Sequence, residues 1–149
     1  MKQVSLYRIV AAVTLALVVA VLLWFASPVT ESANAYNNRG FVYNNQGKYE
    51  KAIATLNKAI ELDPGLAEAY NNRGWAYIEL GQYEQAIADC TKAIELDPTL
   101  AWAYNNRAWA YIELGQYEQA IADCNKAIEL APTLTWAYNN RDWAYSQLE

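Results

Sequence analysis

Two kinds of side chain that are suited to recognition recur in this sequence every 34 residues. The recurring residues are Asn71, Trp75, Asn105, Trp109, Asn139 and Trp143. Indole rings bury a large area at a low cost in conformational entropy, and asparagine amides form hydrogen bonds with a peptide backbone. We therefore expect these positions to form a binding surface and not a reaction centre.

Residue sets that are typical of catalysis are missing from the sequence. It contains no histidine, which removes the most common general base and a frequent metal ligand. It has no Gly-rich phosphate loop and no Ser/His/Asp or Cys/His set. The net charge of −5 argues against a nucleic-acid partner, because phosphates require a basic face. We predict a protein that is not an enzyme and that holds no cofactor or metal.

The two cysteines, Cys90 and Cys124, occupy the same place in successive repeats. Packed helices lie about 8–10 Å apart, whereas a disulfide requires a Cα separation under about 7 Å. We expect both thiols to be small, buried core residues.

The elements that carry the recurring residues are pairs of helices. Residues 67–100 return as 101–134 with four changes, residues 33–66 are a diverged copy, and residues 135–149 are the first half of a further copy. In residues 67–100, apolar residues at helical spacing predict one helix that ends at Gly81 and a second that ends at Asp97-Pro98. A period of this length, built from two helices, predicts a stacked solenoid.

An apolar segment precedes the repeats. Lys2 and Arg8 stand before an uncharged run from Ile9 to Ala26, which would form a helix of about 27 Å, close to the ~30 Å hydrocarbon thickness of a bilayer. A signal peptide has a shorter apolar core, and the small-residue site Ala33-Asn34-Ala35 would cut into the first repeat. We predict a transmembrane signal anchor at 9–26.

The positive charges predict the orientation of this anchor. They place residues 1–8 in the cytoplasm and the repeats, after the short linker 27–32, on the non-cytoplasmic side, which in a bacterium is the periplasm. Secretion after signal cleavage is the alternative.

The repeats resemble the tetratricopeptide repeat (TPR) family, whose signature is W-x2-L-G-x2-Y…A-x3-F…A-x4-P. In the second repeat the matching residues are Tyr70, Gly74, Tyr77, Ala86, Ala93 and Pro98. The signature tryptophan is tyrosine throughout, and the signature leucine is arginine at Arg39, Arg73, Arg107 and Arg141. The resemblance implies an all-α TPR helix-turn-helix solenoid of three repeats, 33–66, 67–100 and 101–134, with 135–149 as a C-terminal capping helix.

The resemblance also implies a protein-binding scaffold whose first helices line a concave surface. We predict a groove that binds an extended or short helical segment of a partner protein. Its expected residues are Asn37, Phe41, Asn71, Trp75, Ile78, Trp102, Asn105, Trp109, Ile112, Trp136, Asn139 and Trp143. The alternative is that the tryptophans serve only as packing in a structural module that self-associates as a homo-oligomer.

One TPR subtype, the carboxylate clamp of chaperone-binding domains, can be compared with this sequence at the positions of its binding residues. Its groove carries two lysines, an arginine and two asparagines. The matching residues here are Asn37, Phe41, Asn72, Trp102 and Asn106, of which only Asn72 agrees. A chaperone C-terminal tail is therefore not the expected ligand.

The arginines at the signature leucine position require partners, because an unpaired buried charge is costly. Asp89 and Asp123 are the acids placed on the inner side of the second helices. We predict structural ion pairs of Arg73 or Arg107 with Asp89, and of Arg107 or Arg141 with Asp123. The sequence leaves open whether each pair forms within one repeat or between two.

Overall fold

The computed structural model describes residues 14, 17 and 31–148. The expected anchor at 9–26 and the segment 1–8 thus fall outside the described residues, except for Thr14 and Leu17. Ser32–Glu149 form one compact unit, distinct from Met1–Glu31. Within the described part of the chain, no helix is both long enough and apolar enough to cross a membrane.

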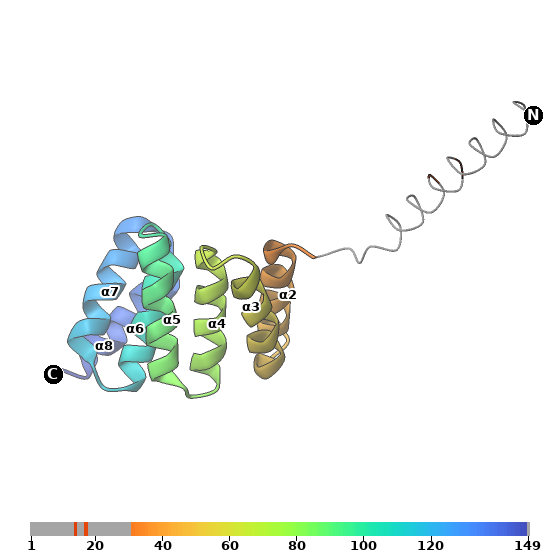
Figure 1. Cartoon of the computed structure of the whole chain (residues 1–149). Coiled ribbons are helices and arrows are strands. Elements are labelled where there is room, and N and C mark those ends of the chain that lie inside the picture. The colour runs from red at the N-terminus through yellow and green to blue at the C-terminus, as the bar shows by residue number, and fades with distance from the viewer. Residues whose placement is uncertain (1–13, 15–16, 18–30, 149) are drawn as a thin grey trace, which may run out of the picture. The chain divides into compact units, whose positions relative to one another are not determined.

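The array of repeats is built from α-helices that follow one another along the chain (Figure 1). Their bounds are α2 (Ala33–Asn45), α3 (Tyr49–Leu62), α4 (Ala67–Glu79), α5 (Tyr83–Leu96), α6 (Ala101–Glu113), α7 (Tyr117–Leu130) and α8 (Thr135–Ser146). The predicted all-α solenoid of three helix pairs and a final single helix is confirmed.

Glycine ends the first helix of each pair. Gly47, Gly81 and Gly115 have φ values of 69°, 71° and 71°, a left-handed conformation that costs other residues about 1–2 kcal/mol. After Gly81, the Gln82 amide donates to the Tyr77 carbonyl at 2.8 Å and so satisfies a carbonyl of the last helical turn. The predicted helix end at Gly81 is confirmed.

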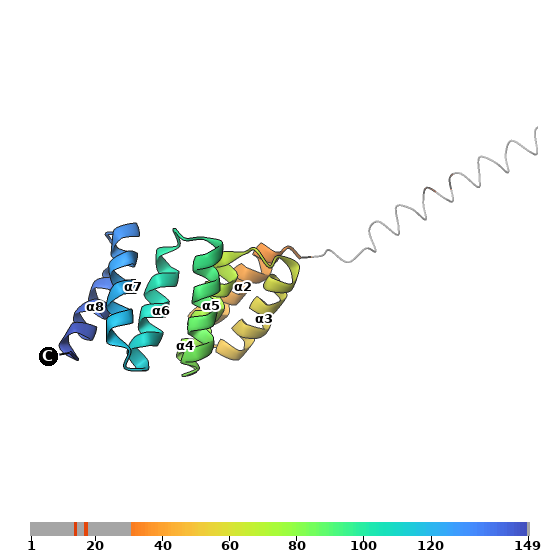
Figure 2. The same ribbon diagram turned by 60° about the vertical axis from the view of Figure 1, so that its left-hand side comes forward.

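The first helices form an inner layer. Helix α4 packs against α2 and α6, and α6 packs against α8, in addition to the contacts that each helix makes with its neighbours along the chain. Among the described helices, the second helices α3, α5 and α7 contact only those that directly precede and follow them. The row of helices seen in Figure 2 therefore has two faces, one built from α2, α4, α6 and α8.

Small residues allow this close packing. Ala69, Ala86, Ala93 and Ala120 have no exposed surface, and Cys90 is equally buried in the contact between α4 and α5. Tyrosines such as Tyr77 and Tyr83 pack around these alanines. Both cysteines are free and buried, as predicted.

Helix α8 packs on α6 and α7 and ends the described array. Its outer surface carries the exposed Asp142, but Trp143, Tyr145 and Leu148 are also about half exposed. The exposed surface of this capping helix therefore combines a charged residue with partly exposed apolar ones.

Candidate binding groove

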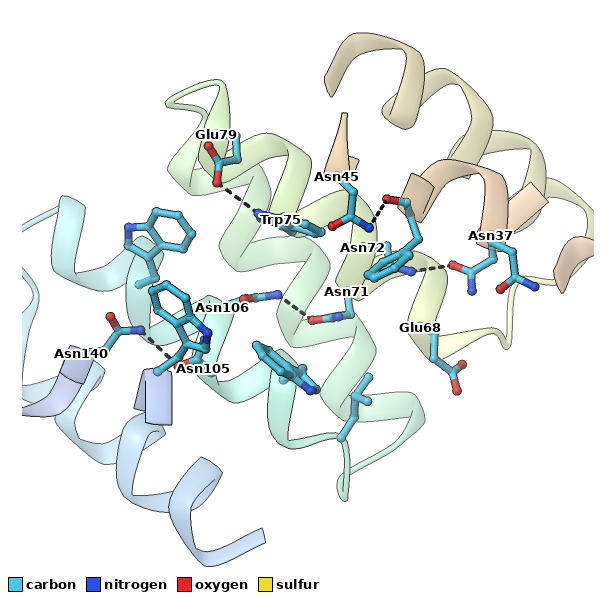
Figure 3. A pocket seen from close by; sticks show the side chains of 16 residues that line it. Asn37, Asn45, Glu68, Asn71, Asn72, Trp75, Glu79, Asn105, Asn106 and Asn140 are labelled. Carbon is cyan, nitrogen blue, oxygen red and sulfur yellow. Dashed lines mark hydrogen bonds between the residues drawn. The ribbon is translucent and has the colours of Figure 1, made fainter. Parts of the chain in front are cut away.

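A groove of about 910 Å³ lies along the inner layer of helices (Figure 3). Its volume is near the upper end of the range of about 300–1,000 Å³ that is usual for ligand sites. The lining residues are Asn37, Asn38, Phe41 and Asn45 of α2, Glu68, Asn71, Asn72, Trp75 and Glu79 of α4, Leu100, Trp102, Asn105, Asn106 and Trp109 in and before α6, and Trp136 and Asn140 of α8. The lining thus consists mainly of aromatic rings and asparagine amides.

The aromatic residues of the groove keep much of their surface exposed to solvent. Trp102 is 48% exposed and Trp136 63%. Phe41 and Trp75 contact each other with ring centroids 6.1 Å apart and an interplanar angle of 55°. No ring contact joins Trp75 to Trp109 among the described residues. The rings therefore form separate apolar steps and not one continuous stack.

Asparagine amides connect the inner helices to one another. Asn72 Nδ2 donates to Asn37 Oδ1 at 2.8 Å, and Asn106 Nδ2 donates to Asn71 Oδ1 at 3.0 Å. A third pair, at 3.1 Å, has Asn140 as donor and Asn105 as acceptor (Figure 3). Each bond joins a first helix to the next first helix, so this asparagine ladder fixes the spacing of the helices beneath the groove.

Glutamates hold the two tryptophans that recur in the middle of the inner helices. Trp75 Nε1 donates to Glu79 Oε1 at 3.1 Å, while Tyr49 Oη donates to Glu79 Oε2, also at 3.1 Å. Partial burial and this bond to Glu79 raise the pKa of Tyr49. Because the carboxylate fixes the N–H edge of Trp75, the carbon surface of the ring is left to line the groove.

The same arrangement occurs one repeat later. Trp109 Nε1 donates to Glu113 Oε1 at 3.2 Å, and Tyr83 Oη donates to Glu113 Oε2 at 3.3 Å. Glu113, however, does not line the groove, whereas Glu79 does.

Eight of the residues expected in the groove line it. They are Asn37, Phe41, Asn71, Trp75, Trp102, Asn105, Trp109 and Trp136. The structure brings these residues from four different helices to one surface.

Four expected groove residues lie elsewhere. Ile78 is 3% exposed and packs with Ala86 and Ala110, and Ile112 is 6% exposed in a cluster with Cys124. These two isoleucines are core residues, because they point to the neighbouring helices and not to the inner surface. In α8, Asn139 and Trp143 do not line the groove, and the Trp143 ring instead contacts Tyr117 edge-on.

The expected groove residues include none of the second asparagines of the Asn-Asn pairs. Asn72, Asn106 and Asn140 all line the groove and act as the donors of the ladder. The repeated doublets were visible in the sequence, but they do not reveal which amide faces the groove.

The predicted arginine–aspartate contacts occur within single repeats. Arg73 Nε and Nη2 donate to Asp89 Oδ2 and Oδ1, both at 2.7 Å. Arg107 contacts Asp123 in the same two-bond manner, at 2.7 and 2.8 Å. Only 9% and 10% of the two aspartate side chains are exposed. The hydrogen bonds that Arg73 donates to Asp89 raise the pKa of Arg73 despite its partial burial.

Arg141 does not pair with Asp123, which corrects that alternative. Its Nη1 donates to Asn125 at 3.3 Å, and its Nε lies 3.7 Å from Asp142 without forming a hydrogen bond. Asp123 is already occupied by both bonds from Arg107.

Within the described residues, no group of three or more His, Cys, Asp or Glu side chains could hold a metal ion. The groove itself offers rings, amides and two carboxylates. Such a lining can hold a ligand by stacking and hydrogen bonding.

Comparison with known proteins identifies the family. The tetratricopeptide repeat model matches residues 33–66, 67–100 and 101–134. The chain therefore belongs to the TPR family, whose fold is a protein-interaction scaffold. No curated protein sequence matches the chain.

Solved structures share both the fold and part of the sequence. The first TPR of Spaghetti (RPAP3) bound to the HSP90 peptide SRMEEVD has 31% identity and a TM-score of 0.75 over 78% of this chain and 93% of that one. The second TPR domain of human RPAP3 with the HSP70 peptide SGPTIEEVD has 32% identity and a TM-score of 0.71, over 76% and 94%. The Arabidopsis OM64 TPR domain has 30% identity and a TM-score of 0.74, over 77% and 95%.

Proposed function

We propose that this chain is a membrane-tethered adaptor that holds an extended segment of a partner protein in the groove. The observation that carries the proposal is the exposed aromatic surface inside a preformed concavity of about 910 Å³. Rings such as Trp102 and Trp136 leave about half or more of their surface to water, and an apolar surface of this kind usually marks an interaction site. The similar structures, which hold short peptides, support a peptide ligand.

The asparagine ladder supplies polar groups that match a peptide backbone. Asn72 uses its Nδ2 in the ladder and keeps Oδ1 as an acceptor, whereas Asn71 accepts through Oδ1 and keeps Nδ2 as a donor. An extended backbone presents both N–H and C=O groups, so neighbouring asparagines can satisfy both. The preformed surface also limits the entropy lost on binding.

The groove does not favour the acidic tails that carboxylate clamps bind. All five positions equivalent to the clamp, Asn37, Phe41, Asn72, Trp102 and Asn106, line the groove. None of them is basic. The groove therefore lies where the carboxylate clamp lies but lacks the positive charge of the clamp.

A membrane tether is the second part of the proposal. It is supported by the uncharged run from Ile9 to Ala26 and by the preceding Lys2 and Arg8. A reporter enzyme that is active only outside the cytoplasm, fused after Glu149, should be active. Activity of a cytoplasm-specific reporter at the same place would contradict this orientation, and a mature N-terminus near Tyr36 would contradict the anchor.

Substitution of the central tryptophans tests the groove. The full-length chain in detergent micelles is immobilised and exposed to a displayed library of random decapeptides. We expect the wild-type chain to retain a subset of peptides that the Trp75→Ala/Trp109→Ala variant loses, with unchanged helicity by circular dichroism. Trp143→Ala is the matched control, because this ring lies outside the groove. Equal retention by the wild-type chain and the double variant would contradict the proposal.

Self-association is the second candidate function. It is favoured by the exposed Trp143, Tyr145 and Leu148 at the end of α8. Sedimentation of residues 33–149 at increasing concentration tests it. A monomer at all concentrations would exclude association through the repeats, and a dimer that Trp143→Ala abolishes would support it.

A further inference from the structure

We propose that the segment held in the groove is cationic, with lysine or arginine side chains placed against Glu68 and Glu79 and its intervening residues lying on Trp75. This inference rests on the proposed function, because it names the partner chemistry of the same groove. It makes a claim about charge that the groove proposal alone does not make.

The charged residues of the groove are all acidic. Of the described residues that line it, Glu68 and Glu79 carry charge and none is a lysine or arginine. Neither glutamate forms an ion pair within the described part of the chain. Glu79 accepts hydrogen bonds only from the neutral Trp75 indole and Tyr49 hydroxyl, so its negative charge is not cancelled. A carboxylate also has about four lone-pair positions, which leaves room for a further donor.

The two carboxylates are aligned on one helix. Glu68 lies in the first turn of α4 and Glu79 is its last residue. Their separation of about three turns places both on the same face, about 16 Å apart along the axis. An extended peptide rises by about 3.3 Å per residue and its side chains alternate between two faces, so basic side chains four or six positions apart would lie on one face and come near both acids.

Trp75 lies between the two acids on the same face of α4. The indole face attracts a cation through its quadrupole, and desolvation in a groove strengthens this attraction. A lysine or arginine stem would also cover apolar ring surface while its charged end remains near a carboxylate. The rings and the acids therefore favour the same kind of side chain.

The similar structures bind peptides whose charge is opposite to the charge proposed here. The peptides bound by the RPAP3 domains, SRMEEVD and SGPTIEEVD, end in two glutamates, a valine and an aspartate. At the five positions equivalent to those of the carboxylate clamp, this chain has only uncharged residues. Its groove also contains the carboxylates of Glu68 and Glu79. An acidic terminus would be repelled here, whereas a basic segment would be attracted, in keeping with the net charge of −5.

The experiment reads the charge of the peptides that the full-length chain retains from the random decapeptide library. We expect enrichment in lysine and arginine, with pairs four or six positions apart. Synthetic copies of enriched peptides, labelled with fluorescein, should bind about fivefold more weakly to Glu68→Gln and to Glu79→Gln. Binding should also weaken as salt is raised from 0.05 to 0.5 M.

Matched variants separate charge from structure. Glu79→Gln keeps one oxygen that accepts from Trp75, and its NH2 group can donate to the Tyr49 hydroxyl oxygen, so it removes the charge while both partners keep a hydrogen bond. Glu113→Gln changes the equivalent residue of the next repeat, which holds Trp109 but does not line the groove, and it should leave affinity unchanged.

Three outcomes would contradict the cationic inference, and they differ in what they leave of the groove proposal. Enrichment of acidic or neutral peptides that Trp75→Ala/Trp109→Ala loses would overturn the cationic inference and leave the groove proposal standing. Equal loss of affinity in Glu79→Gln and Glu113→Gln would also overturn it. No retention above the level of the double tryptophan variant would overturn both proposals.

Discussion

At the scale of the residue, two departures from the TPR signature explain each other. The guanidinium groups of Arg39, Arg73, Arg107 and Arg141 lie over the rings of Tyr36, Tyr70, Tyr104 and Tyr138 at 4.7, 5.6, 5.8 and 5.3 Å. These tyrosines replace the signature tryptophan, and the arginines replace the signature leucine. A cation over an aromatic face contributes about 0.5–2 kcal/mol, and in the second and third repeats an aspartate completes the arrangement.

Loss of one aspartate should destabilise the solenoid. In Asp123→Asn, the half-buried Arg107 keeps its charge and loses a charged acceptor, which should cost about 1–3 kcal/mol of unfolding free energy in chemical denaturation. Glu129→Gln is the control on the same helix, because its pair with Lys126 is exposed and contributes less than about 1 kcal/mol. Equal stability of Asp123→Asn and the wild-type chain would show that the ion pair is not a brace.

The cysteine thiols should be unreactive in the folded protein. Burial raises the pKa of Cys124 to about 12 from its ordinary value of 9.0, and it raises the pKa of Cys90 as well. The raised pKa means that folding favours the neutral thiol, a contribution present below about pH 9 and lost as the pH rises toward 12.

A thiol reagent measures this protection. At pH 8, Ellman's reagent should label both cysteines slowly in the native chain and rapidly in guanidinium chloride. Rapid labelling of both thiols under native conditions would contradict the burial of this core.

At the scale of the element, each helix pair matches one residue on its first helix to one on its second. The matched residues are Gly40 with Leu56, Gly74 with Cys90, and Ala108 with Cys124. A Cβ atom at Gly40 would lie only 2.5 and 2.6 Å from Leu56 side-chain atoms, and one at Gly74 would lie 2.8 Å from Cys90 Sγ. The leucine at position 56 leaves room only for glycine, whereas cysteine stands opposite glycine in the second repeat and opposite alanine in the third.

A double-mutant cycle tests this matching. Gly40→Ala should destabilise the chain by about 1–3 kcal/mol through overpacking against Leu56, despite the higher helix propensity of alanine. Adding Leu56→Cys recreates the pair of the third repeat and should restore part of that loss, giving a favourable coupling energy in thermal or denaturant unfolding. Strictly additive effects would show that the two side chains do not compete for space.

The sequence predicted the position of the groove but not all of its lining residues. Periodicity located the helices, the glycine turns and the inner layer correctly. The predicted stripe of Asn71, Trp75 and Ile78 shares two residues with the groove lining of α4, which is Glu68, Asn71, Asn72, Trp75 and Glu79, but its centre is rotated from that lining by roughly 50°. The same rotation explains why Asn140 lines the groove in place of Asn139.

The cause of this error is physical. An amphipathic pattern separates buried from exposed positions, but Ile78 and Trp75 are both apolar and differ by less than a third of a turn. The rotation of α4 about its own axis, which is set by its packing against α2, α3, α5 and α6, decides which of them reaches the inner surface, and the sequence does not specify this rotation. The bond from Trp75 to Glu79 was likewise hidden, because a pair four residues apart on a helix is common.

At the scale of the whole molecule, the groove is a surface that the repeats share. Helices from all three repeats and α8 contribute to the groove, so no single repeat can form it. Tethering by residues 9–26, as we propose, would confine encounters with partner proteins to the membrane surface and raise their effective concentration. The anchor stays a prediction, because it falls outside the described residues.

Site-specific photocrosslinking in intact membranes tests the central claim most directly. A photoreactive amino acid such as p-benzoylphenylalanine replaces Trp109 in the groove or Trp143 outside it, and mass spectrometry identifies the crosslinked peptides. The account predicts that position 109 captures a defined segment of another protein and that position 143 does not. Equal capture at both positions, or crosslinks from position 109 only to this chain itself, would contradict a groove that binds a partner.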